Sequence, residues 1–105
     1  MDQVVDITRF ESTMSQEYLR LTKRQSEVLR LISREFTTKE ICSELRISKS
    51  AVQVHKSALF EKLGVRSSLG LVLACFKRGI LVLKKEGDQV HVVIRRVDIT
   101  HADHV

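Results

Sequence analysis

The sequence predicts a mainly α-helical fold that ends in a small β element. Apolar residues recur at the 3.6-residue spacing of helices from about Phe10 to Phe76. After Gly79 the pattern changes to two runs rich in β-branched residues around a turn. At 105 residues and 43% hydrophobic content, the chain has room for one compact domain. We therefore expect a four-helix domain with an extra N-terminal helix and a C-terminal β-hairpin.

The extra N-terminal helix is expected from about Arg9 to Arg20. Thr8 and Glu11 have the spacing of a capping box, in which a hydroxyl and a carboxylate satisfy backbone N–H groups at a helix start. Its apolar side recurs at helical spacing through Phe10, Met14, Tyr18 and Leu21. This divides the chain into an N-terminal helical extension over 1–20, the helical domain over 21–81, and a hairpin with its tail over 82–105.

The first two helices of the domain are each marked by a further capping box. Thr22 with Gln25 starts the first, and its buried side is expected to be Val28, Leu29 and Ile32. Thr37 with Glu40 starts the second, and the expected buried positions are Ile41, Cys42 and Leu45.

A third helix follows after the short turn Arg46-Ile47-Ser48. Ser48 is a suitable N-cap, the helix runs to Leu63, and Gly64 tolerates the left-handed conformation that ends helices. Two helices joined by so short a turn must cross steeply, which is a helix-turn-helix.

The third helix has two different faces. Val52, Leu59 and Leu63 form its inward stripe. Ser50, Gln53, Val54 and Ser57 point the opposite way, and this small, uncharged face is suited to a DNA major groove. Lys49 and Lys56 flank the face and can reach phosphates.

The chain resembles the LuxR-type, or GerE-like, helix-turn-helix family of bacterial transcription regulators over about three fifths of its length. The resemblance is carried, in order and without gaps, by the opening Leu21-Thr22-x-Arg24-x-x-Glu27-Val28-Leu29, the segment 37–48, the segment 51–55, Lys62-Leu63-Gly64-Val65, and Gly79-Ile80-Leu81. It implies binding of double-stranded DNA, with Gln53, Val54 and Ser57 facing base edges and phosphates held by Thr38, Lys39, Lys49, Ser50 and Lys56.

Three positions depart from the family pattern, which usually has glycine at Glu35, threonine at Ala51 and lysine at Gln53. We expect Glu35 to keep the link between the first two helices in ordinary φ space. Ala51 removes a hydroxyl near the start of the recognition helix. Gln53 replaces a charged contact with a side chain that can pair with adenine, so base preference should differ from that of the family.

The fourth helix is expected from Ser68 to Arg78 and has no polar face, so something must cover its outer side. The resemblance implies dimerisation through it, and the alternative is coverage by the chain's own tail. The dimerisation residues would be Leu69, Gly70, Val72, Leu73 and Phe76.

The tail beyond Gly79 is not explained by the resemblance. Ile80–Leu83 and Val90–Val97 read as two strands joined by a turn at Glu86–Gln89. Two strands alone are marginal, so the hairpin must dock on the helices or pair with another chain. Asp98–Val105 is expected to fray.

Charge is concentrated in the helical domain. Residues 22–85 hold fourteen of the 18 lysines and arginines but five of the 13 acidic residues, as phosphate neutralisation requires, although a solvated basic surface would look the same. Cys42 and Cys75 fit a reducing compartment as core residues. With neither a signal peptide nor a membrane segment apparent, we expect a cytoplasmic protein that does not engage the membrane.

The sequence indicates no enzyme, because it has no phosphate loop, no paired carboxylates in an apolar pocket and no nucleophile with a base. We expect neither cofactor nor metal. The short segment before the domain cannot hold a receiver or ligand-binding domain, so the chain resembles stand-alone family members. Two functions remain. One is a homodimeric regulator on a near-palindromic promoter site, and the other is a protein-interaction module that pairs with another regulator or RNA polymerase and binds DNA weakly.

Overall fold

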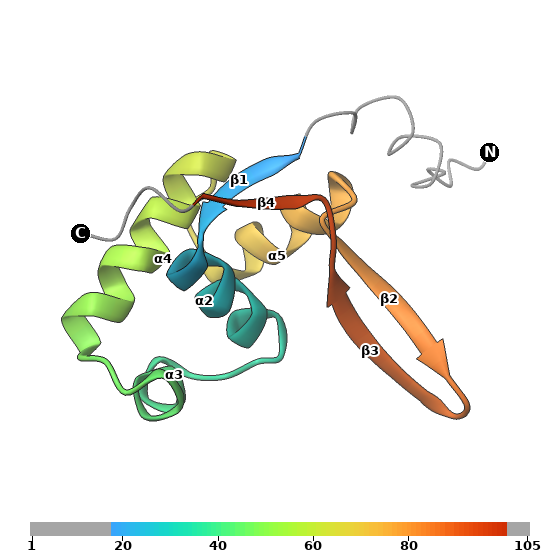
Figure 1. Ribbon diagram of the computed structural model, residues 1–105, viewed down its shortest axis with the longest axis horizontal. Helices are drawn as coiled ribbons and strands as arrows, with labels where there is room; N and C mark the ends of the chain where they lie inside the picture. Colours follow the sequence, from blue (N-terminus) through green and yellow to red (C-terminus); the bar gives the residue numbers. More distant parts are fainter. Residues whose placement is uncertain (1–17, 101–105) are drawn as a thin grey trace.

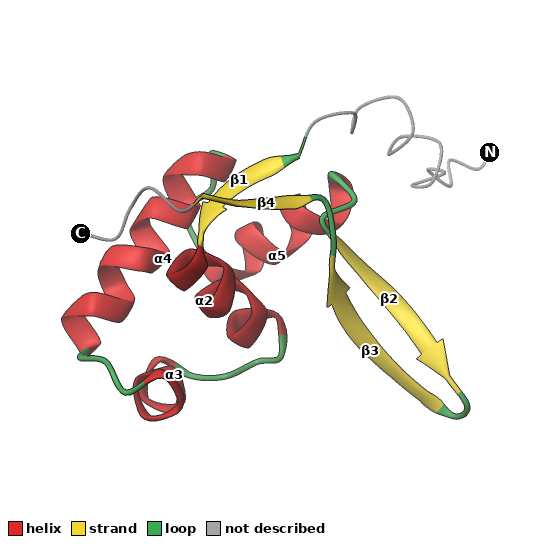
Figure 2. Cartoon of the chain, viewed as in Figure 1, coloured by secondary structure: helices red, strands yellow, loops and turns green. Residues whose placement is uncertain are grey.

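The computed structural model describes residues 18–100 of the chain. Its elements follow in the order β1 (Leu19–Thr22), α2 (Lys23–Ser33), α3 (Thr38–Leu45), α4 (Lys49–Leu63), α5 (Ser68–Lys77), β2 (Leu81–Glu86), β3 (Gln89–Ile94) and β4 (Val97–Thr100). Four helices surround one core, with β1 and β4 crossing over them and the β2–β3 hairpin projecting from the side opposite α4 (Figures 1 and 2). The expected four helices and hairpin are confirmed. The expected second strand over Val90–Val97 is wrong at its end, because β3 stops at Ile94, Arg96 is left-handed at φ 61°, and Val97 begins β4. The expected turn at Glu86–Gln89 is shorter, because both of these residues belong to strands.

The capping boxes form as the sequence predicts. Thr22 N–H donates to Gln25 Oε1 at 3.0 Å, and Thr22 Oγ1 accepts from Gln25 N–H at 3.0 Å. Thr37 and Glu40 make the same pair of bonds at 2.8 and 3.1 Å. These bonds satisfy backbone donors that a helix leaves free, and so fix where α2 and α3 begin.

The core is built from inward residues of all four helices together with β1 and the start of β2. Its fully buried members come from segments far apart in the sequence. They include Leu21, Val28, Leu29, Ile41, Val52, Leu59, Leu71, Cys75 and Leu81. The expected inward positions Cys42, Leu45 and Leu63 are partly buried and pack against this core.

The expected helix over Arg9–Arg20 is wrong at its end. Leu19 and Arg20 belong to strand β1, Tyr18 is exposed and not helical, and residues 9–17 lie outside the described residues. Leu19 and Leu21 are buried while Arg20 is exposed, which is the alternation of a strand. The helical spacing of Tyr18 and Leu21 was therefore misleading, because β1 has a strand to pair with.

That partner is β4, so the expectation of fraying from Asp98 is also wrong up to Thr100. The two strands are parallel, with Leu19 opposite Val97 and Leu21 opposite Ile99. Leu19 N–H also donates to the Arg96 carbonyl at 2.8 Å. The C-terminal segment thus ties down the entry to α2 (Figure 1).

Glu35 does not keep ordinary φ space, because its φ is 66°. Phe36 N–H donates to the Leu31 carbonyl at 3.0 Å, and Glu35 N–H donates to the Ile32 carbonyl at 2.9 Å. This pair of bonds is a Schellman motif, which requires a left-handed residue after the helix. The hydrogen bonds and the partly buried Phe36 outweigh the cost of placing a glutamate there.

Candidate nucleic-acid interface

The turn between α3 and α4 sets the pose of the expected recognition helix. Arg46 is left-handed at φ 58°, and Ile47 N–H reaches the Cys42 carbonyl at 3.2 Å. Ser48 then caps α4 by accepting from Ala51 N–H at 3.1 Å. Three residues thus turn the chain from α3 into α4, as the helix-turn-helix prediction requires.

The other end of α4 is held by Lys62. Its ammonium group donates to the Arg20 carbonyl at 2.6 Å and to Gln25 Oε1 at 3.1 Å. Gln25 is the buried polar side chain of the α2 capping box. The end of α4 is therefore fixed to β1 and to the start of α2, so the exposed face of α4 has a defined orientation.

The three expected base-reading residues lie together on that exposed face. Gln53, Val54 and Ser57 are all exposed, whereas Val52 and Leu59 on the opposite side are fully buried. Val54 is 64% exposed, although it is a β-branched apolar residue. An apolar methyl pair among amide and hydroxyl groups can meet a thymine methyl while its neighbours pair with base edges.

The expected phosphate-binding residues come from both helices. Lys39 on α3 and Lys49 and Ser50 at the start of α4 are exposed. Lys56 and Thr38 are half-buried, and the Lys56 ammonium group lies 3.5 Å from Thr38 Oγ1. The structure therefore brings Lys56 and Thr38 into contact, and the other three residues are exposed and can reach the phosphates of a bound duplex.

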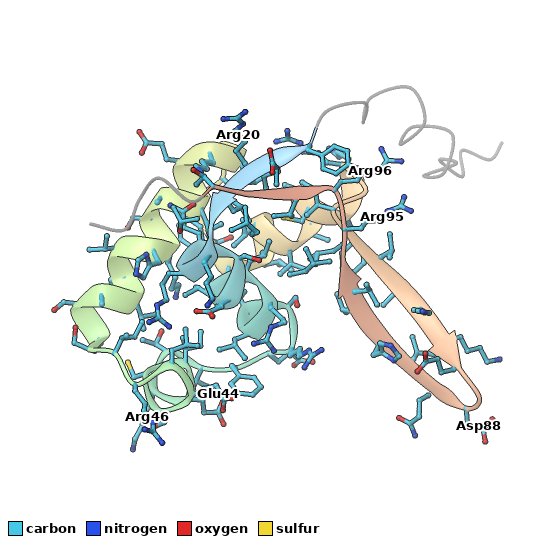
Figure 3. All side chains as sticks on the ribbon, in the orientation of Figure 1. Arg20, Glu44, Arg46, Asp88, Arg95 and Arg96 are labelled. Carbon is cyan, nitrogen blue, oxygen red and sulfur yellow. The ribbon has the colours of Figure 1, made fainter. Side chains whose placement is uncertain are left out.

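Arg46 is a cation on this side of the molecule that the sequence interpretation assigned only to the turn. Its exposed side chain points away from the body beside the start of α4 (Figure 3). An arginine inside the turn of a helix-turn-helix, directly before the N-cap, was the signal that could have identified it. Arg95 and Arg96 lie far from α4 at the base of the hairpin (Figure 3), and Arg95 Nε donates to the Gly79 carbonyl at 3.0 Å.

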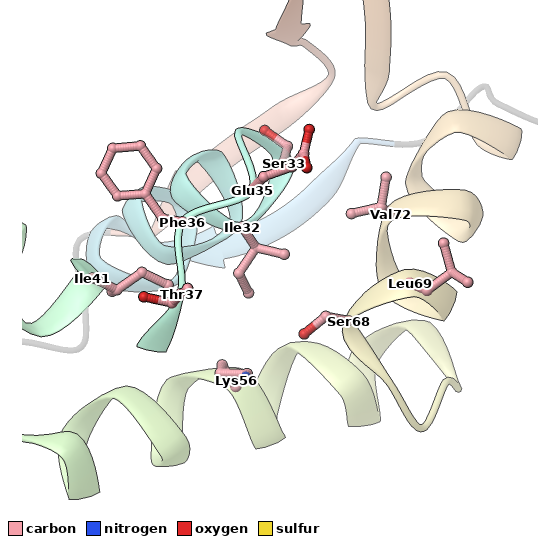
Figure 4. A pocket seen from close by; sticks show the side chains of 10 residues that line it. All are labelled: Ile32, Ser33, Glu35, Phe36, Thr37, Ile41, Lys56, Ser68, Leu69 and Val72. Atoms are coloured by element: carbon pink, nitrogen blue, oxygen red, sulfur yellow. The ribbon is translucent and has the colours of Figure 1, made fainter. Parts of the chain in front are cut away.

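A cleft of about 490 Å³ opens between the end of α2, α4 and α5. Its walls are mainly apolar, with one cation, one carboxylate and three hydroxyls (Figure 4). The lining residues are Ile32, Ser33, Glu35, Phe36, Thr37, Ile41, Lys56, Ser68, Leu69 and Val72. Within residues 18–100, no group of His, Cys, Asp and Glu is arranged to hold a metal ion.

The expected dimerisation residues on α5 fall into two sets. Leu69 and Leu73 are 69% and 57% exposed, while Val72 and Phe76 are partly buried against the core. Gly70 faces its own chain, because a Cβ there would lie 3.3 Å from Ser67 Oγ and 3.4 Å from Val65 Cβ. The exposed apolar surface on the outer side of α5 therefore consists of Leu69 and Leu73.

Neither cysteine is in a disulfide. Cys75 is fully buried on α5, as the core assignment predicts, and Cys42 is partly buried on α3. Burial raises the pKa of the Cys75 thiol to about 11, and the nearby Arg78 charge opposes this rise. The thiol is thus neutral at physiological pH. None of the helices in the described part of the chain is both long and apolar enough to span a bilayer.

The helix-turn-helix and its exposed face define a DNA-binding protein of the transcription-regulator class. The chain belongs to the luxR family of bacterial regulatory proteins, whose family model matches residues 19–75. The match contains α2, α3, α4 and most of α5. The hairpin and β4 lie beyond it.

Individual relatives agree with this membership. The spore germination protein GerE of Bacillus subtilis is 44% identical over 63 residues, which cover 60% of this chain and 85% of GerE. The uncharacterized response regulatory protein YgeK of Escherichia coli is 35% identical over 63 residues, covering 60% of this chain and 43% of YgeK. The chain thus spans most of one relative and less than half of the other.

Two solved structures are similar as well. The structure of the transcription factor GerE matches with a TM-score of 0.51 and 36% identity, covering 56% of this chain and 88% of GerE. The structure of the Vibrio cholerae VqmA dimer, a LuxR-type receptor in the absence of its target DNA, matches with a TM-score of 0.56 and 27% identity, covering 73% of this chain and 37% of VqmA.

Proposed function

We propose that this protein regulates transcription by placing α4 in the major groove of a specific DNA site, as a homodimer on a near-palindromic promoter element. The observation that carries the proposal is the face of Gln53, Val54 and Ser57, which is exposed, uncharged and held in a fixed orientation by Ser48 and Lys62. Water solvates such an uncharged face less favourably than a charged one, whereas in a major groove its side chains can pair with base edges.

Phosphate contacts would set the register of α4 in the groove. Lys39, Lys49 and Ser50 are exposed around the start of α4. Lys56 on α4 and Thr38 on α3 lie close enough to contact one phosphate together. Arg46 extends this set at the turn. Phosphate contacts position a protein on the duplex without reading its sequence, which leaves specificity to the uncharged face.

Dimerisation is proposed through the outer side of α5. Leu69 and Leu73 are exposed there, and a twin helix would cover them. Two recognition helices related by a twofold axis would then occupy successive major grooves roughly 34 Å apart. VqmA, a LuxR-type receptor, is a dimer and has a target DNA, which supports the same assembly here.

A second candidate function is a protein-interaction module that pairs with another regulator or RNA polymerase and binds DNA weakly. The exposed apolar residues outside α4, on α5 and on the hairpin, favour it. The two functions differ in their dependence on α4, because only the first requires the Gln53 face and its flanking lysines.

Fluorescence anisotropy with labelled duplex DNA tests the proposal. Lys49→Ala and Lys56→Ala should each weaken binding, because each removes a phosphate contact. Lys84→Ala is the matched control, since Lys84 is exposed on the hairpin at the far side of the molecule from α4 (Figure 1). If the two α4 variants bind DNA as tightly as the control, the assignment of α4 is wrong and the interaction module becomes the better account.

A further inference from the structure

The exposed large apolar side chains gather on two neighbouring elements. Val54 belongs to the proposed reading face, and Tyr18 adjoins the residues outside the described part. The others lie on α5 and on the β2–β3 hairpin, and they are Leu69, Leu73, Leu83 and Val90. Two consecutive elements therefore each leave large apolar side chains in water, which commonly marks a surface that a partner covers.

The hairpin has one apolar and one polar face. Cross-strand partners share a face, and the pairs Leu81 with Ile94, Leu83 with Val92, and Lys85 with Val90 make up the first. At its base this face joins the core, because Leu81 is buried. Towards the tip it is bare, since Leu83 is 65% exposed and Val90 is 57% exposed.

The opposite face pairs Val82 with Val93 at its base and carries polar and charged groups towards the tip, and Lys85 is the one charged residue on the apolar face. Lys84 Nζ and His91 Nε2 lie 4.0 and 3.9 Å from the Glu86 carboxylate, and Gln89 stands opposite Glu86. These side chains suit solvent. The hairpin therefore has the pattern of a sheet that is half covered, although it projects from the body (Figure 1).

The hairpin cannot close over the outer side of its own α5. Only residues 78–80 join Lys77 to Leu81, and Ile80 is buried. Ile80 N–H donates to the Cys75 carbonyl at 2.8 Å, and the Ile80 carbonyl accepts from Arg95 N–H at 2.8 Å. This connection is short and bonded on both sides, and α5 turns Leu71 and Cys75 inward and its two exposed leucines away.

We propose that the apolar face of the hairpin is a dimerisation arm that packs on the outer side of α5 of a second copy of this chain. A two-stranded ribbon needs a helix or further strands to be stable, and α5 offers an apolar helical stripe that its own hairpin cannot reach. Exchange between two copies covers Leu83 and Val90 of each chain against α5 of the other, at the edge of the contact that the two helices make through Leu69 and Leu73. The contact is the same from both sides, so it closes as a dimer.

A contact between two α5 helices alone is too small for a stable dimer, which supports a second copy of the chain as the partner of the hairpin. A ten-residue helix is about 15 Å long, so two such helices meet over a strip on the order of 150 Å². A stable interface needs roughly 800 Å² from each partner. Each hairpin adds a face of six-residue strands, about 20 Å long, and it follows α5 after only residues 78–80. The arm thus enlarges the interface with a hairpin that projects from the side opposite α4, away from the exposed face of Gln53, Val54 and Ser57 (Figure 1).

Sedimentation equilibrium of the whole chain tests this arm, which rests on the proposed homodimer. Val90→Glu places a charge on the apolar face, yet opposite Lys85, so the hairpin can still form. Gln89→Lys is the matched control, because it places a charge on the polar face opposite Glu86 one residue earlier. We expect Val90→Glu to weaken self-association roughly tenfold or more, since it would bury a charge, and the control to leave it unchanged. If circular dichroism shows that Val90→Glu is unfolded, Leu83→Gln replaces it, and we expect the same weakening of self-association.

Cysteine cross-linking between two different variants identifies the contact directly. Leu69→Cys and Val90→Cys chains, each in a Cys42→Ser background, are mixed and oxidised. The exchange predicts disulfides between the two different chains. Disulfides only between identical Leu69→Cys chains, together with unchanged association of Val90→Glu and Leu83→Gln, would overturn the arm while keeping the α5 homodimer. A chain that stays monomeric with and without DNA would overturn both.

Discussion

The Lys56 ammonium group on α4 lies 3.5 Å from the Thr38 hydroxyl on α3. The two helices of the helix-turn-helix therefore present a cation and a hydroxyl at one point, where a phosphate oxygen could accept from both. Lys56 is half-buried, so its ammonium group is held near this point more firmly than a fully exposed lysine would be.

Lys56→Met is expected to weaken DNA binding about equally for all sequences and to lower the slope of affinity against salt by about 1. Thr38→Val should weaken binding less, because it removes a neutral donor. If the two groups hold one phosphate, the double variant should lose less affinity than the two single losses combined. DNA titrations at several salt concentrations measure the affinity and its salt slope. Fully additive losses of affinity would show that Lys56 and Thr38 do not hold the same phosphate.

Gln53→Ala is expected to relax base preference with little loss of affinity for random DNA. A glutamine that pairs with adenine contributes roughly 1 to 3 kcal/mol of discrimination against the wrong base. Competition between a preferred site and single-base variants of it measures this term. Gln89→Ala on the hairpin is the matched control, and equal base preference in both variants would remove Gln53 from the reading face.

Glu35→Gly is expected to stabilise the fold by about 1 kcal/mol, because glycine adopts the φ of 66° without the cost that a Cβ brings. Glu44→Gly should have the opposite sign, since Glu44 lies inside α3, where glycine costs about 1 kcal/mol. Urea unfolding of the two variants measures both. Destabilisation by Glu35→Gly would show that the glutamate side chain contributes more than its backbone conformation costs.

Removal of β4 should destabilise the helical domain although it lies outside the family match. A chain ending at Arg96 loses the backbone bonds that β4 makes to β1 and the packing of Val97 on the core, which together contribute about 2 kcal/mol to the free energy of unfolding. A chain ending at Thr100 keeps both and is the control. Thermal unfolding compares them, and equal midpoints would mean that β1 holds without its partner.

The Cys75 thiol should make the protein less stable at alkaline pH. Its pKa is about 11 when folded and 9.0 when exposed, so the folded state holds the proton more tightly. This contribution is complete below pH 9.0 and is lost as the pH rises to about 11, for roughly 2 to 3 kcal/mol. The free energy of unfolding should therefore fall less steeply for Cys75→Ala over this range than for Cys42→Ala. Equal slopes would contradict the burial effect.

Local rules predicted the parts of the fold that depend on neighbouring residues. The capping boxes at Thr22 and Thr37 and the caps at Ser48 and Gly64 involve residues within one turn, and all four are confirmed. The β2–β3 hairpin is likewise local, because its strands are joined by a short turn. Each of these features could be read from a window of a few residues.

Non-local pairing accounts for one feature that the sequence did not reveal, and a local backbone motif accounts for another. β1 is a strand because β4 pairs with it from the other end of the chain, and no local pattern near Leu21 signals that partner. Glu35 is left-handed because the Schellman bonds at the end of α2 outweigh its own preference. On α4 the exposure of Gln53, Val54 and Ser57 agrees with the prediction, whereas their contacts with bases remain predictions.

Selection of bound sequences from a random duplex DNA library at physiological salt tests the proposed regulator most directly. We predict an enriched inverted repeat whose half-sites are about one helical turn apart, and a weaker adenine preference when Gln53→Ala is selected in parallel. Weak binding without enrichment of any sequence would contradict a sequence-specific regulator and favour the protein-interaction module.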